Sequence, residues 1–203
     1  MFLRKLFTIV GFLGKPANIL LTGLMFQTGA YATDNTVKPE NILAVVTADW
    51  NEDGSFDRAI LLASETETDQ ADLLVYLSNS PNSMKLAISK KGIAWQGAMW
   101  GTQPTLELSG KNGLAIISAN DAIGRNRWQQ KLTIAYRNKV FVVGGYTYED
   151  RDTLDLDAGS TCDVNFFTGK GLKNKKPFNV LAKAVNLSDW SESDIPKACH
   201  SSS

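Results

Sequence analysis

The chain has one histidine and two cysteines among its 203 residues, and these low numbers exclude several kinds of site. The histidine, His200, lies in the serine-rich segment 200–203. A catalytic Ser/His/Asp or Cys/His arrangement needs a histidine held inside the domain, so such an arrangement is difficult to build here. A zinc site made of His and Cys ligands is excluded by the same numbers.

Long hydrophobic runs and basic blocks are scarce as well. After Ala32 no apolar segment is long enough to cross a bilayer, and no cluster of Lys and Arg indicates nucleic-acid binding. Before that point a basic start precedes an apolar run at 19–26, and Ala30-Tyr31-Ala32 has the A-x-A pattern of a cleavage site. The sequence therefore predicts a signal peptide at residues 1–32 and a periplasmic or secreted protein.

Removal of this leader would leave a mildly acidic chain with enough residues for one domain and a substantial core. We expect a flexible mature N-terminus at 33–40, a single β domain at 41–199 and a tail at 200–203. In an exported protein an even number of cysteines favours pairing. Cys162 and Cys199 are therefore predicted to form a disulfide that holds the C-terminal segment against the domain.

Short apolar segments bounded by polar turns predict an all-β fold of about ten mainly antiparallel strands, arranged as a sandwich or as part of a propeller. We expect a short C-terminal helical turn after Ser188. Segment 41–48 is rich in β-branched residues and predicts a strand buried on both faces. The predicted strands are 41–48, 59–63, 72–77, 84–88, 105–108, 113–118, 128–136, 140–148, 162–167 and 178–185.

Strict alternation at 128–136 is the strongest secondary-structure signal, and with 140–148 it predicts a long hairpin. Gly144 and Gly145 indicate a bulge or a bend in the return strand. The pattern of this strand predicts Phe141 and Val143 on one face and Val140, Val142, Tyr146 and Tyr148 on the other.

The loop between the first two predicted strands has the pattern D-x-N-x-D-G-x-x-D. Oxygen-bearing side chains at alternate positions, followed by a turn-forming glycine and a further carboxylate, suit the many oxygen ligands that Ca²⁺ needs. The predicted ligands are the side chains of Asp49, Asn51, Asp53 and Asp57 and the backbone carbonyl of Ser55. The alternative is a metal-free turn, because Asp, Asn and Gly also occur in turns for backbone reasons.

An EF-hand would place a bidentate glutamate at the twelfth loop position, where this chain has Ile60, and its flanks would be helical. Residues 45–77 instead combine strand, calcium loop, strand, polar turn and strand, and this segment resembles one FG-GAP or VCBS-type repeat. That resemblance implies calcium in the loop and β-propeller blades in extracellular adhesion and binding proteins. Glu52 stands where glycine is usual, and no second copy of the motif follows.

Two further features leave alternatives open. The acidic stretch 149–157 is either a solvated loop, which we favour, or a second calcium site at Asp152, Asp155 and Asp157. Trp95 and Trp100 are expected in the core, although exposed tryptophans would suit stacking on sugars.

These features predict a calcium-stabilised binding or interaction module of the cell envelope, with a protein or a glycan as its partner, rather than an enzyme. One alternative is a carbohydrate-active hydrolase that uses an Asp/Glu pair, with Trp95 or Trp100 as a sugar platform. Others are an inhibitor or immunity-type protein that neutralises an envelope-targeting enzyme, and a purely structural envelope component.

Overall fold

The computed structural model describes residues 37–80, 82–155 and 157–200, all of them within one compact unit, Thr36–Ser203. The predicted signal peptide and the first half of the predicted flexible segment 33–40 lie outside the described residues. Within the described ranges, the three helical segments are single turns of three residues each, and none of them is a membrane-spanning helix.

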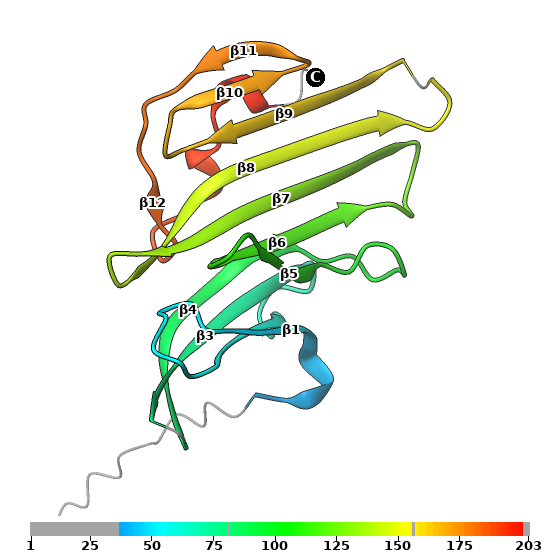
Figure 1. Cartoon of the computed structure of the whole chain (residues 1–203). Coiled ribbons are helices and arrows are strands. Elements are labelled where there is room, and N and C mark those ends of the chain that lie inside the picture. Colours follow the sequence, from blue (N-terminus) through cyan, green and yellow to red (C-terminus); the bar gives the residue numbers. More distant parts are fainter. Residues whose placement is uncertain (1–36, 81, 156, 201–203) are drawn as a thin grey trace, which may run out of the picture. The chain divides into compact units, whose positions relative to one another are not determined.

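The predicted all-β class is confirmed, with two antiparallel sheets in which strands that are consecutive in the chain pair as neighbours (Figure 1). One sheet has the order β1-β2-β3-β4, and the other has the order β11-β10-β9-β8-β7-β6-β5, with β12 paired to β8. The strands are β1 (Ile42–Ala48), β2 (Asp57–Ala63), β3 (Gln70–Ser80), β4 (Ser83–Trp95), β5 (Thr105–Ser109), β6 (Gly113–Asn120), β7 (Asn126–Arg137), β8 (Val140–Asp152), β9 (Gly159–Asn165), β10 (Lys170–Lys173), β11 (Lys176–Asn179) and β12 (Val185–Asn186).

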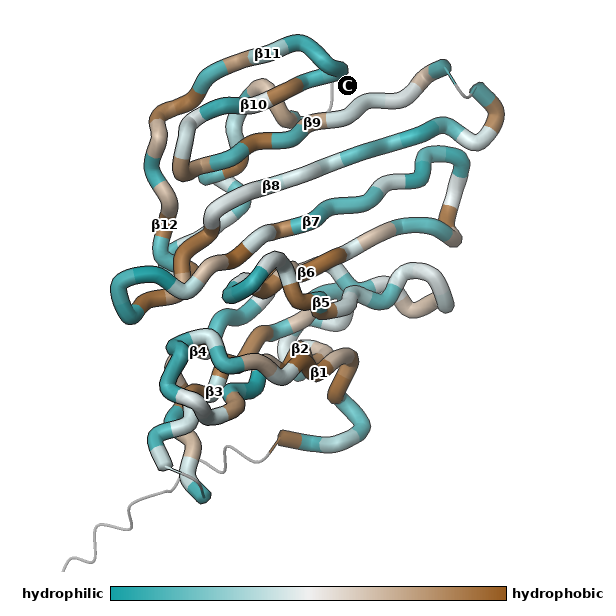
Figure 2. The backbone as a smooth tube through the Cα atoms, viewed as in Figure 1, coloured by the Kyte–Doolittle hydropathy of each residue, from teal (hydrophilic) through white to brown (hydrophobic). Residues whose placement is uncertain are grey.

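The predicted hairpin of β7 and β8 is confirmed, and so is the bulge. Ile134 pairs with Val143 but Thr133 pairs with Gly145, so Gly144 is the extra residue. A side chain at Gly144 would collide with the ring of Phe167, which explains the glycine at this position. Hydrophobic residues gather near the β7–β8 turn, and the other ends of both strands are hydrophilic (Figure 2).

The bulge overturns the predicted faces of β8. Because one extra residue shifts the alternation, Tyr146 faces the same side as Val143, and each pairs with a buried residue of β7. Tyr148 follows on that side, opposite Gln130. The prediction that the two tyrosines lie opposite Phe141 and Val143 is therefore wrong.

Two further strand predictions are wrong. The segment 41–48 is not buried on both faces, since β1 is the outermost strand of its sheet and Val45 is 49% exposed. The predicted strand 178–185 is divided between β11 and β12, with no strand at 180–184. β12 joins β8 at Val142 and Val143, on the far side of the point where β9 pairing ends.

One continuous cluster of buried side chains unites the two sheets. The four-stranded sheet contributes Leu61, Leu73 and Val75, and the eight-stranded sheet contributes residues such as Ile134 and Val143. The C-terminal segment covers part of this cluster with Leu187 and Trp190, and ends at η3 (Lys197–Cys199).

The predicted disulfide between Cys162 on β9 and Cys199 is confirmed. The predicted helical turn is confirmed as η2 (Glu192–Asp194), where Ser191 and Asp194 form a capping box. The bond and the turn together fix the path of the C-terminal segment along the domain.

Candidate functional site

The predicted calcium loop is closed at its end by a buried carboxylate. Asp57, the first residue of β2, is fully buried, and its Oδ2 accepts a hydrogen bond from the amide of Trp50 at 2.9 Å. Its Oδ1 accepts one from the amide of Ser78, near the end of β3, also at 2.9 Å. Asp57 therefore ties the loop to its own sheet, and Trp50 beside it packs its ring edge-on against Phe141 of β8.

The other predicted ligands lie together at the exposed part of the loop. Asp49 accepts hydrogen bonds from the amides of Asp53 (3.0 Å) and Gly54 (2.9 Å). Asn51 Oδ1 accepts one from Asp53, and Asp53 accepts one from Ser55 at 2.8 Å. Loop amides thus occupy these side-chain oxygens in the way of Asx turns. Among the described residues, no three His, Cys, Asp or Glu side chains converge as a metal-binding group.

The predicted calcium ligands therefore differ in how accessible their oxygens are to an ion. Asp49, Asn51 and Asp53 carry hard oxygen donors at the exposed turn, and each of those oxygens has a second lone pair beyond the one that an amide uses. Asp57 differs from these three, because it is fully buried and its carboxylate accepts hydrogen bonds from the amides of Trp50 and Ser78.

Glu52, where the resembled repeat has glycine, adopts the left-handed conformation with φ of 58°. Its carboxylate accepts hydrogen bonds from Lys111 Nζ at 3.0 Å and Asn112 Nδ2 at 2.7 Å, both in the β5–β6 turn. These donors lower the pKa of Glu52. The side chain thus links the loop to the second sheet, which gives a physical reason for a residue other than glycine.

Asp152, Asp155 and Asp157, the possible second calcium site, differ in their hydrogen bonds. Asp152 accepts a hydrogen bond from Arg125 Nε at 2.6 Å, and this bond is the main reason that the pKa of Asp152 is lowered. Asp155 Oδ1 accepts one from the amide of Asp157. An arginine thus offsets the charge of one member of the acidic stretch.

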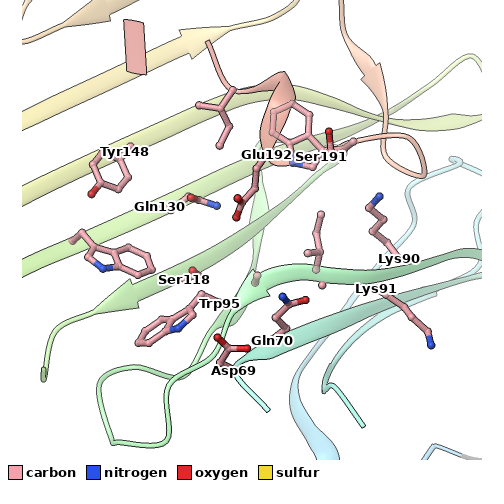
Figure 3. A pocket seen from close by; sticks show the side chains of 16 residues that line it. Asp69, Gln70, Lys90, Lys91, Trp95, Ser118, Gln130, Tyr148, Ser191 and Glu192 are labelled. Atoms are coloured by element: carbon pink, nitrogen blue, oxygen red, sulfur yellow. The ribbon is translucent and has the colours of Figure 1, made fainter. Parts of the chain in front are cut away.

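A groove of about 610 Å³ runs between the end of β4, strands β6 to β8, and the C-terminal segment around η2 (Figure 3). Three aromatic rings form one wall, which we call the aromatic wall: Trp95 of β4, Trp128 of β7 and Tyr148 of β8. The centroids of Trp95 and Trp128 are 5.2 Å apart with planes tilted by 55°. The rings of Trp128 and Tyr148 are stacked, with their centroids 6.4 Å apart.

Polar side chains surround the aromatic wall. Gln130 lies two residues after Trp128 on the same face of β7, and its Oε1 accepts a hydrogen bond from Tyr146 at 3.3 Å. Burial raises the pKa of Tyr148 and raises that of Tyr146 to about 12, so both phenols keep their protons at neutral pH. The groove thus presents a phenol and an amide beside flat ring faces.

Ser118 is the most informative polar residue of the groove. It is 2% exposed, it lines the groove, and its Oγ has no hydrogen-bond partner among the described residues. A buried hydroxyl without a partner is costly, and a ligand or a water molecule in the groove would satisfy it. Asp69 and Glu192 bring carboxylates to the groove from different segments of the chain (Figure 3).

The sequence predictions captured only part of this site. Trp95, predicted to lie in the core, is partly exposed in the groove. Trp100, also predicted to lie in the core, is 95% exposed and is not among the groove residues. Trp128 and Gln130 were visible as one face of an alternating strand. The bulge places Tyr148 on the face opposite to the predicted one, and no pattern in the sequence indicates Ser118.

Comparison with models of known protein families, with curated proteins and with solved structures finds no match to this chain. In the structure, residues 45–77 do follow the expected order of strand, loop, strand, turn and strand. The resemblance of this segment to an FG-GAP or VCBS-type repeat stays a prediction.

Proposed function

We propose that this protein is an exported binding module that takes a glycan of the cell envelope in the groove. The aromatic wall beside polar side chains carries this proposal. A sugar ring has an apolar face of C–H groups and a rim of hydroxyls, so it is complementary to flat rings flanked by hydrogen-bonding groups. The groove volume of about 610 Å³ lies within the usual range of small-molecule sites.

Each group has a defined task in this proposal. The rings of Trp95 and Trp128 receive the sugar face, and Tyr148 extends the wall along β8. The Ser118 hydroxyl and the Gln130 amide provide hydrogen bonds to sugar hydroxyls. Since the side-chain oxygen of Gln130 already accepts from Tyr146, its amide nitrogen supplies the donor.

Replacing Trp128 with Ala is expected to weaken glycan binding at least tenfold, because it removes the central ring of the aromatic wall. An array of envelope polysaccharides and neutral oligosaccharides would identify a bound glycan, and calorimetric titration would then compare the variants. Trp100→Ala is the matched control, since it removes an equally large ring outside the groove. If no glycan binds the wild type, or if Trp128→Ala binds as tightly, the proposal is wrong.

A second candidate function is glycoside hydrolysis in the same groove, favoured by the two carboxylates of Asp69 and Glu192 (Figure 3). Glycosidases use two such groups on either side of the scissile bond. The bound glycan from the titration serves as substrate, and new reducing ends that disappear in Glu192→Gln, with binding retained, would identify an enzyme. If the glycan stays intact after long incubation, the hydrolase function is wrong and only the binding function remains.

We also propose that Ca²⁺ stabilises the domain through Asp49, Asn51 and Asp53. At saturating Ca²⁺ the melting temperature is expected to rise by about 5–10 °C over that in chelator, since tight binding to the folded state alone contributes a few kcal/mol. Asp53→Ala should abolish the increase. Identical melting curves of the wild type in Ca²⁺ and in chelator would contradict the proposal.

A further inference from the structure

Four exposed apolar side chains lie on three neighbouring loops at one end of the eight-stranded sheet. Trp100 is 95% exposed and Met99 is 52% exposed, both on the loop between β4 and β5. Ile123 (43%) lies on the β6–β7 turn and Leu154 (79%) on the β8–β9 loop. We call these four residues the loop-tip patch.

Backbone hydrogen bonds hold the three loops beside one another. The amide of Asp121 donates to the carbonyl of Gly101 at 3.1 Å, which joins the first loop to the β6–β7 turn. The amide of Thr153 donates to the carbonyl of Arg125 at 3.1 Å, which joins that turn to the third loop. The β6–β7 turn and the β8–β9 loop project from the same end of the sheet (Figure 1). The loop-tip patch is therefore a fixed feature of that end.

The charges around the loop-tip patch are balanced or acidic. Arg125 pairs with Asp152 at 2.6 Å, and Arg151 pairs with Asp121 at 2.6 Å. The β8–β9 loop adds two more exposed carboxylates, those of Asp155 and Asp157. Arg127 of β7, opposite Arg151, adds a third arginine to this end. Three arginines stand against the four carboxylates of Asp121, Asp152, Asp155 and Asp157, so this end of the domain carries no excess positive charge that would attract an anionic surface.

We propose that the loop-tip patch inserts into the interfacial region of a zwitterionic lipid bilayer. The four apolar side chains are spread over three loops among polar residues, and a fluid lipid surface can accommodate such separate tips, whereas a protein partner would need a matching pocket for each tip. An exposed tryptophan suits this region because its ring is apolar and its N–H is polar. The neutral to acidic surroundings fit phosphatidylcholine and phosphatidylethanolamine better than anionic lipids.

The proposal is tested by measuring the binding of this protein to vesicles of phosphatidylcholine and phosphatidylethanolamine. The protein used is the chain from Thr33 onward, which keeps the compact unit Thr36–Ser203. The wild type is expected to sediment with the vesicles, and brominated lipid should quench its tryptophan fluorescence. Trp100→Ser should lower the partition coefficient at least tenfold and remove that quenching, and Leu154→Ser should lower the partition coefficient as well. Both side chains are exposed, so the melting temperatures of these variants should match that of the wild type.

Leu181→Ser is the matched control, because Leu181 is as exposed as Leu154, at 79%, but follows β11. It should bind vesicles like the wild type, and so should the groove variant Trp128→Ala, which separates this surface from glycan binding. A wild type that does not sediment, or a Trp100→Ser variant that sediments equally, would overturn the proposal. So would binding that appears only with phosphatidylglycerol and is lost in high salt, or self-association without lipid that Trp100→Ser abolishes.

Discussion

Replacing Asp57 with Ala is expected to lower the free energy of unfolding by about 3–5 kcal/mol. The substitution removes two hydrogen bonds to a carboxylate, each worth roughly 1.5–3 kcal/mol, and leaves the amides of Trp50 and Ser78 without their acceptor. Because Asp57 is fully buried, water does not replace the lost acceptor without opening the core. The effect should extend to Trp50, whose ring packs against Phe141 of the other sheet.

Urea denaturation in chelator measures this effect free of any contribution from calcium. Asp53→Ala is the matched control: the same chemical change in the same loop, at an exposed carboxylate, should cost less than about 1 kcal/mol in chelator. The loss of unfolding free energy in Asp57→Asn should lie between those of Asp57→Ala and Asp53→Ala, since asparagine keeps one acceptor oxygen but turns an amide nitrogen toward a donor. Equal losses in Asp57→Ala and Asp53→Ala would show that the buried carboxylate has no special role.

Asp57→Ala and Asp53→Ala also distinguish two roles of the loop carboxylates, that of a calcium ligand and that of a hydrogen-bond acceptor for the backbone. If Asp57 acted mainly as a calcium ligand, Asp57→Ala would lose its stability in Ca²⁺ and be close to the wild type in chelator. The hydrogen bonds of Asp57 lead us to expect a loss of similar size in both conditions, whereas Asp53→Ala should differ from the wild type mainly in Ca²⁺.

Features of the fold that depend on local pattern could be predicted from the sequence. Alternation along 128–136 specifies a strand because successive side chains of a strand face opposite sides. The turn at 137–139 then fixes the antiparallel partner. The pairing of Cys162 with Cys199 follows from the expected export of the chain and from the number of cysteines, since two cysteines allow one disulfide.

The groove depends on contacts that no local pattern encodes. Tyr148 joins the aromatic wall only because the bulge at Gly144 shifts the alternation of β8, and Gly144 is required by the distant Phe167 ring. Ser118 reads as an ordinary residue of β6 until the C-terminal segment and β4 enclose the space beside it. The exposure of β1 likewise depends on its position at the sheet edge, because a β-branched run suits edge and central strands equally.

Removing the disulfide is expected to lower the free energy of unfolding by about 4 kcal/mol, because the bond closes a loop with a sequence separation of 37 and restricts the unfolded chain. Both cysteines are buried, so the double variant Cys162→Ala and Cys199→Ala is preferable to serine, which would place a hydroxyl in the core. Urea denaturation of the variant and of the oxidised and reduced wild type measures the effect. A loss below about 1 kcal/mol would contradict it.

The same bond should matter for glycan binding. The segment between β12 and η3 carries Trp190 and Glu192, which line the groove, and the disulfide holds the far end of this segment to β9. Without the bond, the short pairing of β12 with β8, the hydrogen bond from Lys90 Nζ to the Ser188 carbonyl and the packing of Leu187 and Trp190 remain to hold this wall. We therefore expect glycan affinity to fall in the double variant under conditions where it remains folded, together with faster hydrogen exchange at 187–195. Vesicle binding should persist, because the loop-tip patch lies on loops that the C-terminal segment does not form.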